Sequence, residues 1–243
     1  MNAPVNATEI RRYLVVNADD FGLSAGTSRG IIEAHERGIV TSTSLMVRQP
    51  AAAEAAAYAA GRPELSVGLH VDLGEWVFGD GEWRQAYEVA PADDAEAVAA
   101  ELARQLRTFF DLMGRAPTHL DSHQHVHRDE PLRSILLRLG GELNVPVREF
   151  TPGIAFCGGF YGQAKKGFPL PEGITVENLI QIIGQLPPGV SELGCHPGLD
   201  EALESTYRAE RIVEVRTLCD SRVLAGLDAT GCELISFANL PRT

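Results

Sequence analysis

Tyr-Leu-Val-Val-Asn-Ala-Asp-Asp-Phe-Gly, residues 13–22, is the stretch that decides the fold class. Its first five residues are a nearly continuous apolar run, which is typical of a strand buried on both faces in a parallel sheet. The run leads into Asp19 and Asp20. Two adjacent carboxylates just past a buried strand are costly unless positive groups pair with them. Because Ser24 already offers a cap for the next helix, we expect the two aspartates to be functional.

The same alternation of strand and helix continues along the chain. Strands are predicted at 13–17, 41–47, 65–73, from 118 onward, and at 145–150, 191–195 and 233–237. Helices are predicted at 25–37, 51–60, 93–114, 132–143, 176–186 and 208–218. Strands that alternate with helices of this length indicate parallel βαβ units. With no internal repeat and no linker, the 243 residues suit one α/β domain of the size common for α/β barrels.

Two segments rich in glycine and aromatic residues are predicted as long loops, at 74–91 and 151–170. Aromatic rings on the first could stack on a sugar face, pack as a small cluster or make an oligomer contact. Lys165-Lys166 gives the second a local positive charge on an acidic protein. Loops of this length suit an active site better than regular structure.

Composition excludes several classes of partner. The 33 acidic and 21 basic residues give a net charge of −12, which argues against nucleic acid and anionic membranes. No segment approaches the length of a membrane span, and the first dozen residues lack the apolar run of a signal peptide. The four cysteines form no CxxC pair and fit reduced thiols. We therefore expect a cytoplasmic protein, with residues 1–11 a flexible tail of the single domain 1–243; a homodimer is compatible with the sequence.

The segment Thr118–His127 reads Thr-His-Leu-Asp-Ser-His-Gln-His-Val-His and carries four of the seven histidines. In an extended chain one face, about 27 Å long, would carry His119, Asp121, His123, His125 and His127. No single metal ion could contact all five, so they would divide into metal ligands and supporting groups. A helix would pair histidines at i, i+4 as in zinc proteases. Since the glutamate of that motif is absent and Pro117 stands just upstream, we favour a strand that ends in a loop.

Two more histidines follow predicted strands. His70 lies near the C-terminal end of strand 65–73, and His196 comes directly after strand 191–195, held before Pro197. In parallel α/β folds, functional groups gather at the C-terminal ends of strands. The aspartate pair, both histidines and the histidine-rich segment all fall there, so we expect them to share one site.

These residue types predict metal-assisted hydrolysis. One carboxylate and two imidazoles make a divalent-metal site that leaves positions open for water and substrate. The remaining carboxylate can take a proton from bound water, and a separate histidine can protonate a leaving group. The residues alone do not choose among acyl, amide and phosphate bonds.

Five segments resemble the signature segments of the YdjC-like carbohydrate deacetylases, which include chitooligosaccharide deacetylases and a hopanoid-biosynthesis branch. They are, in order, Asn17–Ser24, Gly38–Thr43, Val67–His70, Pro117–His127 and Glu192–Gly198. The resemblance covers nearly the whole chain. It implies a distorted (β/α) barrel that removes an N-acetyl group from an amino sugar with the help of one divalent metal ion.

The resemblance also implies a role for each candidate residue. The metal ligands would be Asp20, His70 and His125, with His123 as the rival of His125. Asp19 would activate water, and His196 would protonate the departing amine, while the metal stabilises the tetrahedral oxyanion. The rest of the histidine-rich segment would support these groups or contact substrate: His119, Asp121, His123 and His127.

The ion and the exact substrate stay open. Members of this family are usually credited with magnesium, whereas two imidazole ligands favour zinc or a similar transition ion such as cobalt, nickel or manganese. Two other functions remain: a metal-dependent hydrolase of another amide, an ester or a phosphate ester, and a carbohydrate-binding protein that has lost turnover. The presence of both Asp19 and His196 argues against the second.

Overall fold

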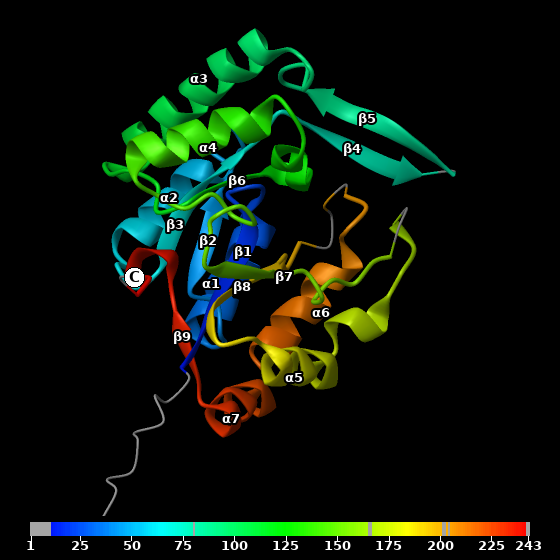
Figure 1. The fold of residues 1–243 in the computed structure, drawn as a ribbon. Helices are drawn as coiled ribbons and strands as arrows, with labels where there is room; N and C mark the ends of the chain where they lie inside the picture. Colours follow the sequence, from blue (N-terminus) through cyan, green and yellow to red (C-terminus); the bar gives the residue numbers. More distant parts are fainter. Residues whose placement is uncertain (1–10, 80, 165–166, 201–202, 204, 242–243) are drawn as a thin grey trace, which may run out of the picture.

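The computed structural model describes residues 11–79, 81–164, 167–200, 203 and 205–241. Within them lies a curled parallel sheet of seven strands, in the order β6-β3-β2-β1-β8-β7 with β9 paired to the first half of β1 (Figure 1). The strands are β1 Arg12–Phe21, β2 Ser42–Leu45, β3 Ser66–Val71, β6 Leu120–Ser122, β7 Ile154–Cys157, β8 Gly189–Cys195 and β9 Cys232–Ile235. Residues 1–10 of the predicted tail, and the predicted charge at Lys165-Lys166, fall outside this part of the chain.

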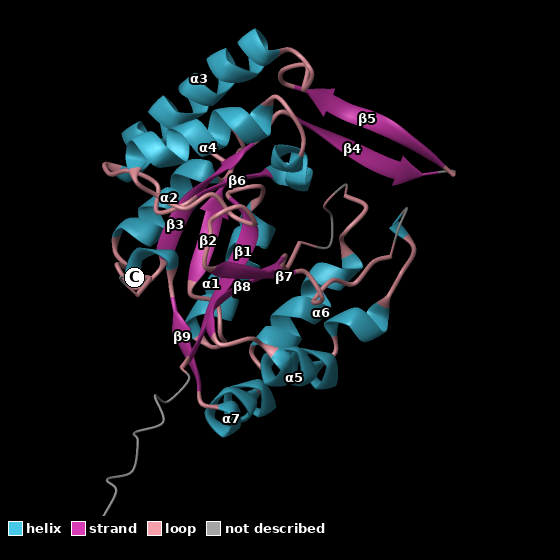
Figure 2. Ribbon diagram, in the orientation of Figure 1, coloured by secondary structure: helices cyan, strands magenta, loops and turns pink. Residues whose placement is uncertain are grey.

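Helices surround the curled sheet (Figure 2). Along the chain, α3 packs against α2 and α4, and α6 packs against α1 and α5. The helices are α1 Ala25–Glu36, α2 Ala52–Ala60, α3 Ala95–Met113, α4 Leu132–Leu143, α5 Val176–Gln185, α6 Ala209–Leu218 and α7 Ser221–Thr230. This is the expected α/β class, a distorted (β/α) barrel. In the described residues, every helix is too short or too polar to cross a membrane.

Strand β1 is the centre of the sheet. It is buried without interruption from Leu14 to Phe21 and pairs with β2, β8 and β9, which confirms the strand buried on both faces. Each fully buried Leu or Val there contributes about 1.5–3 kcal/mol of apolar transfer free energy. Ser24 caps α1 by accepting a hydrogen bond from the Thr27 amide at 2.9 Å, so neither aspartate is needed as that cap.

The prediction of a long loop at residues 74–91 is wrong. Residues 74–91 contain an antiparallel hairpin of β4 (Gly74–Gly79) and β5 (Glu82–Glu88), which stands apart from the main sheet. Gly81 adopts a φ of +86° beside the turn, a conformation that glycine reaches without steric cost. Alternating aromatic and polar residues on either side of such a turn favour a hairpin.

The prediction of a strand at residues 145–150 is also wrong. Val147 makes only an isolated parallel bridge with Leu120, and Glu149 has a φ of +67°, which ends any extended run. The amides of Phe150 and Thr151 then donate back to the Val147 carbonyl. The strand β7 that pairs with β8 lies instead inside the segment predicted as the second loop.

The histidine-rich segment is a strand for only three residues. β6 ends at Ser122, and a 3₁₀ helix, η1 (His123–Arg128), follows it. Within η1, Gln124 and His125 have φ values of +51° and +54°, so the chain turns sharply and successive histidines point in different directions. Further short 3₁₀ helices are η3 (Pro171–Ile174) and η4 (Phe237–Asn239).

Candidate active site

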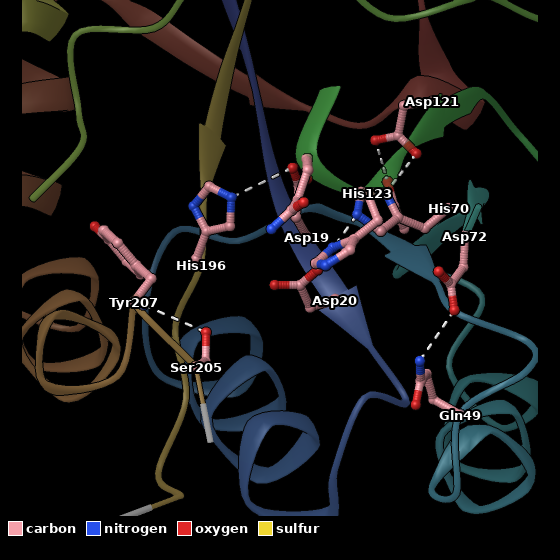
Figure 3. Close-up of polar contacts among 12 residues, drawn as sticks. Asp19, Asp20, Gln49, His70, Asp72, Asp121, His123, His196, Ser205 and Tyr207 are labelled. Atoms are coloured by element: carbon pink, nitrogen blue, oxygen red, sulfur yellow. Dashed lines mark hydrogen bonds and ion pairs between the residues drawn. The ribbon is translucent and has the colours of Figure 1, made fainter. Parts of the chain in front are cut away.

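Parallel pairing brings the polar ends of four strands to one edge of the barrel. Asp19 and Asp20 lie at the end of β1, His70 on β3, His123 just after β6, and His196 just after β8. Figure 3 shows Asp20 next to His70 and His123, and Asp19 between this group and His196. The two aspartates, His70, His196 and His123 of the histidine-rich segment therefore lie together, as predicted.

Asp20 is the centre of a group of one carboxylate and two imidazoles, all buried. Its Oδ1 atom lies 2.9 Å from Nδ1 of His123 and 3.3 Å from Nε2 of His70, and one ligand atom from each residue lies within 4.8 Å of the others. The Oδ2 atom accepts a hydrogen bond from Arg211 at 2.6 Å. Burial opposes the charge on Asp20, but Arg211 and His123 hold its pKa well below the usual range. A φ of +70° at Asp20 turns its carboxylate toward the two imidazoles.

His70 is fixed from behind by a second carboxylate. Its Nδ1 atom lies 2.8 Å from Oδ1 of Asp121, which leaves Nε2 to face Asp20. Burial opposes protonation of His70, but Asp121 raises the pKa of the imidazole well above its usual value. A carboxylate behind an imidazole is the usual support of a metal-binding histidine, because it sets the tautomer and the ring orientation.

Asp19 has different partners from Asp20. Its Oδ1 atom accepts hydrogen bonds from Arg148 at 2.7 Å and from Asn17 at 2.8 Å, and its Oδ2 atom lies 3.6 Å from Nε2 of His196. Burial would raise the pKa of Asp19, but the Arg148 guanidinium together with His70 and His196 lowers that pKa. Asp19 is therefore ionised at neutral pH and faces a histidine.

Arg148 is the largest of the fully buried side chains in this region, at 2 % exposure. One guanidinium nitrogen, Nη1, donates to both Asp19 and Asp121, and Glu192 lies 3.8 Å from Nε. Arg148 thus joins the carboxylate that faces His196 to the carboxylate that orients His70. Neutralising two buried carboxylates is what keeps both ionised in a low-dielectric interior.

His196 lies on the side of Asp19 that faces away from Asp20, and it packs against aromatic rings. The rings of Tyr161 and Tyr207 lie 5.5 and 5.4 Å from it, and its backbone N–H donates to Glu214, which also accepts from the Tyr207 hydroxyl. Burial lowers the pKa of His196 to about 4, so the imidazole is neutral at rest. Burial also raises the pKa of Glu214, to about 8.

His125, implied as a metal ligand, does not group with Asp20. Its Nδ1 atom lies 3.0 Å from Oε1 of Glu149, and it falls into two other groups, with Asp19 and His196 and with His127 and Glu149. The left-handed backbone at Gln124 and His125 causes this difference, because it takes His125 away from the direction that an extended strand would give it.

The other members of the segment support the site from within the core. His119 lies against Phe237 with ring centroids 4.1 Å apart and places Nε2 3.0 Å from the Ser44 hydroxyl. His127 places Nδ1 2.7 Å from the Ser122 hydroxyl. Burial lowers the pKa of His119 to about 3 and of His127 to about 4, so both are neutral packing groups.

Sequence reasoning did not single out the basic and acidic residues that surround these groups: Arg148, Glu149, Glu192, Arg211 and Glu214. For α6 a signal existed. Arg211 precedes Val215 by four residues, and Glu214 precedes Leu218 by four, so both lie on the buried stripe of that helix. Arg148 and Glu149 gave no such signal, because their segment is irregular.

The site opens into a cavity of about 400 Å³, within the range of small-molecule sites. The two aspartates and the four histidines His70, His123, His125 and His196 line it. Aromatic side chains make much of the rest of the wall: Trp76, Trp83, Phe156, Phe160, Tyr161 and Tyr207.

The fold and the site define a class of protein: a distorted (β/α) barrel whose strand ends deliver paired aspartates and imidazoles to one pocket. The particular family follows from comparison with known sequences. The chain belongs to the YdjC-like protein family, whose sequence model matches residues 13–229.

Similar proteins extend over nearly the whole chain. A carbohydrate deacetylase from Geobacillus stearothermophilus is 33 % identical, with 93 % of this chain and 97 % of the relative covered. A chitooligosaccharide deacetylase from Serratia marcescens is 32 % identical, with 95 % and 100 % covered. A solved structure from Enterococcus faecalis, named for cellobiose-phosphate cleavage, has a TM-score of 0.76 at 26 % identity, with 93 % and 98 % covered. A family 4 carbohydrate esterase from Streptomyces lividans shares the fold alone, with a TM-score of 0.53 at 12 % identity over 93 % and 91 % of the chains.

Proposed function

We propose that this protein is a carbohydrate deacetylase that hydrolyses the N-acetyl group of an amino sugar. Full-length similarity to proteins named as deacetylases supports this activity. The observation that carries it is the division of labour between two adjacent carboxylates: Asp20 faces two imidazoles, and Asp19 faces His196 across the cavity. Water would add to the acetyl carbon, the carbon–nitrogen bond would break, and the products would be acetate and a free amine.

We assign the metal ligands to Asp20, His70 and His123, so that His123 takes the place implied for His125. The three residues fit a divalent ion because their ligand atoms converge within 4.8 Å, and Asp121 and Arg211 hold two of them from behind. One oxygen and two nitrogen donors favour zinc, cobalt or nickel over magnesium. When bound, the ion would polarise the acetyl carbonyl and make bound water more acidic.

We propose Asp19 as the general base. It is ionised and lies beside the ligand group. Arg148 and Asn17 hold its Oδ1 atom, so that Oδ2 stays directed toward His196. A positioned base of this kind typically contributes 10²- to 10⁴-fold to the rate.

We propose His196 as the group that protonates the departing amine. It is neutral at rest, and its Nε2 atom lies 3.6 Å from the carboxylate that removes the proton from water. The same proton can therefore pass through His196 to the leaving nitrogen, which keeps the site electrically balanced through the reaction.

The remaining expectations stay proposals. The net charge of −12 supports a neutral sugar ligand over nucleic acid. The four cysteines are unpaired, which supports a reducing, cytoplasmic location. We also propose that residues 1–243 form a single domain and that the protein is a homodimer.

The experiment is acetate release from N-acetylglucosamine and its di- and trisaccharides. Protein stripped with a chelator would be reloaded with zinc, cobalt, nickel, manganese or magnesium. We expect release that depends on the metal and is lost in Asp19→Asn but kept in Asp111→Asn, a matched change at an exposed aspartate on α3. Silence on all three sugars with metal-loaded protein, together with turnover of an aryl ester or phosphate ester, would replace the deacetylase with another hydrolase of the same site.

A further inference from the structure

The β4–β5 hairpin carries an aromatic face. Phe78 and Trp83 are directly opposite each other in the register of the hairpin, and Trp76 lies two residues before Phe78, so the three share one face. Trp76 and Trp83 are 47 % and 50 % exposed. Both line the cavity that contains Asp19 and Asp20. Figure 1 shows that the hairpin extends outward beyond the main sheet, on the side of η1.

The hairpin is fixed to the active site at two points. The side chain of Gln124 accepts from the Trp76 amide at 2.9 Å and donates to the Trp76 carbonyl at 2.7 Å. The Phe78 amide donates to the Thr206 hydroxyl at 3.1 Å. An isolated two-stranded hairpin is marginally stable in water, so these contacts hold the aromatic face in place. Because Gln124 directly follows His123, the position of Trp76 is tied to that of a proposed metal ligand.

Contacts within the hairpin do not bury the two tryptophan side chains. Phe78 and Trp83 contact each other with ring centroids 5.3 Å apart, yet about half of each tryptophan stays in solvent. Large aromatic surfaces left open beside a pocket mark a ligand site more often than a structural one. Indole rings present a flat apolar face with a polar N–H at the edge, which matches the alternating C–H and hydroxyl groups of a pyranose ring.

We propose that Trp76 and Trp83 form a subsite for the sugar ring next to the one that loses its acetyl group, and that Gln124 positions this subsite. The protein then selects N-acetylated oligosaccharides over the single amino sugar. This inference rests on the proposed function, because the neighbouring ring is defined relative to the reacting one. Glu75 and Arg128 on the same cavity wall supply polar groups for the hydroxyls of the bound chain.

The first test uses binding without turnover. The chain has two tryptophans, and both lie on the hairpin, so indole fluorescence reports on this face alone. Metal-loaded Asp19→Asn protein would be titrated with N-acetylglucosamine and with its trisaccharide. We expect the trisaccharide to change the emission and to bind about tenfold more tightly, the scale of one aromatic stacking contact. Equal affinity for the two sugars, or binding of the trisaccharide with unchanged emission, overturns the subsite.

The second test measures the ratio of kcat/KM for the trisaccharide to kcat/KM for the monosaccharide. Trp76→Ala should lower this ratio about tenfold, and Gln124→Ala, which keeps both indoles but removes both hydrogen bonds to Trp76, should lower it as well. Phe110→Ala is the matched control, because Phe110 is an exposed aromatic on α3 outside the cavity. A ratio unchanged in Trp76→Ala overturns the inference.

The two proposals fail in different ways. Acetate release from mono- and trisaccharide with equal efficiency would remove the subsite and keep the deacetylase. A fluorescence response to the trisaccharide in a protein whose wild type releases no acetate would keep Trp76 and Trp83 as an oligosaccharide-binding face and remove the deacetylase.

Discussion

Nδ1 of His123 lies 2.9 Å from Oδ1 of Asp20, although 103 positions separate the two residues in the sequence. The contact forms because β6 ends one residue before His123, at the same edge of the sheet where β1 delivers Asp20. Two residues later, His125 pairs with Glu149 instead. The single turn of left-handed backbone between them therefore decides which histidine reaches Asp20.

The first prediction concerns metal content. His123→Ala should reduce the bound zinc or cobalt from about one ion per chain to a small fraction, because one of three ligands is lost. His125→Ala, a matched change two residues away, should keep the ion. Elemental analysis after dialysis against buffered metal decides between them. Loss of the ion in His125→Ala with retention in His123→Ala would return the ligand role to His125.

The second prediction separates the two aspartates. Asp19→Asn should retain the metal and lose at least about 10²-fold in kcat, the scale of general-base catalysis. Asp20→Asn should lose the metal, because a neutral amide replaces the only anionic ligand of the proposed site. Metal analysis and acetate release on the same preparations give both values. A metal-free Asp19→Asn protein would show that the two roles are reversed.

The part of the site that sequence reasoning could reach is the part that follows strands. Asp19, Asp20, His70 and His196 each come at the end of a buried, parallel strand. The apolar run predicts the strand, and residues that follow the run are expected at the C-terminal edge of the sheet. Predicting the order of the strands in the sheet requires knowledge of long-range pairing, whereas predicting the fold class does not. For these residues, local pattern and global topology agree.

Positions that depend on irregular backbone could not be reached in this way. The direction of His125 is set by two successive positive φ values, which no residue type at 124 or 125 demands. Arg148 and Glu149 lie where an apolar pattern favours a strand, but tertiary contacts of the turn at Val147–Thr151 override that preference. In residues 74–91 the content of glycine and aromatic residues favours a loop, whereas the alternation of aromatic and polar residues favours the hairpin that forms.

The third prediction is a pH dependence that Glu214 causes. Burial raises the pKa of Glu214 from about 4.5 in the unfolded chain to about 8 in the folded protein. Between these values the folded state binds a proton that the unfolded state has released, so the stability from this group is lost as the pH rises. The free energy of unfolding of the wild type, relative to Glu214→Gln, should therefore fall from pH 5 to pH 8, by up to about 1.4 kcal/mol per pH unit.

Urea unfolding of both proteins at pH 5, 6, 7 and 8 tests this difference. Glu192, whose pKa burial raises to about 7, titrates in both proteins and cancels in the comparison. A difference that stays constant over the range would mean that Glu214 is ionised throughout.

The fourth prediction concerns Arg148, whose guanidinium serves two buried carboxylates. Arg148→Met keeps the length of the side chain but leaves Asp19 and Asp121 without their shared cation. Removing one partner of a buried ion pair costs about 3–5 kcal/mol, so the free energy of unfolding at pH 7 should fall by that amount. Arg37→Met is the control, because Arg37 pairs with Glu33 at the surface of α1 and such pairs contribute at most about 0.5 kcal/mol.

The pH dependence of the same variant identifies the cause. Without Arg148, the largest of the charges that oppose burial at Asp19 is gone, so the pKa of this carboxyl should rise and the folded variant should take up a proton as the pH falls. The wild-type carboxylate, with its lowered pKa, stays ionised at pH 5. The stability gap between the two proteins should therefore narrow from pH 7 to pH 5. A gap of equal size at both pH values would mean that Arg148 stabilises the fold through the packing of its aliphatic stem and not through its charge.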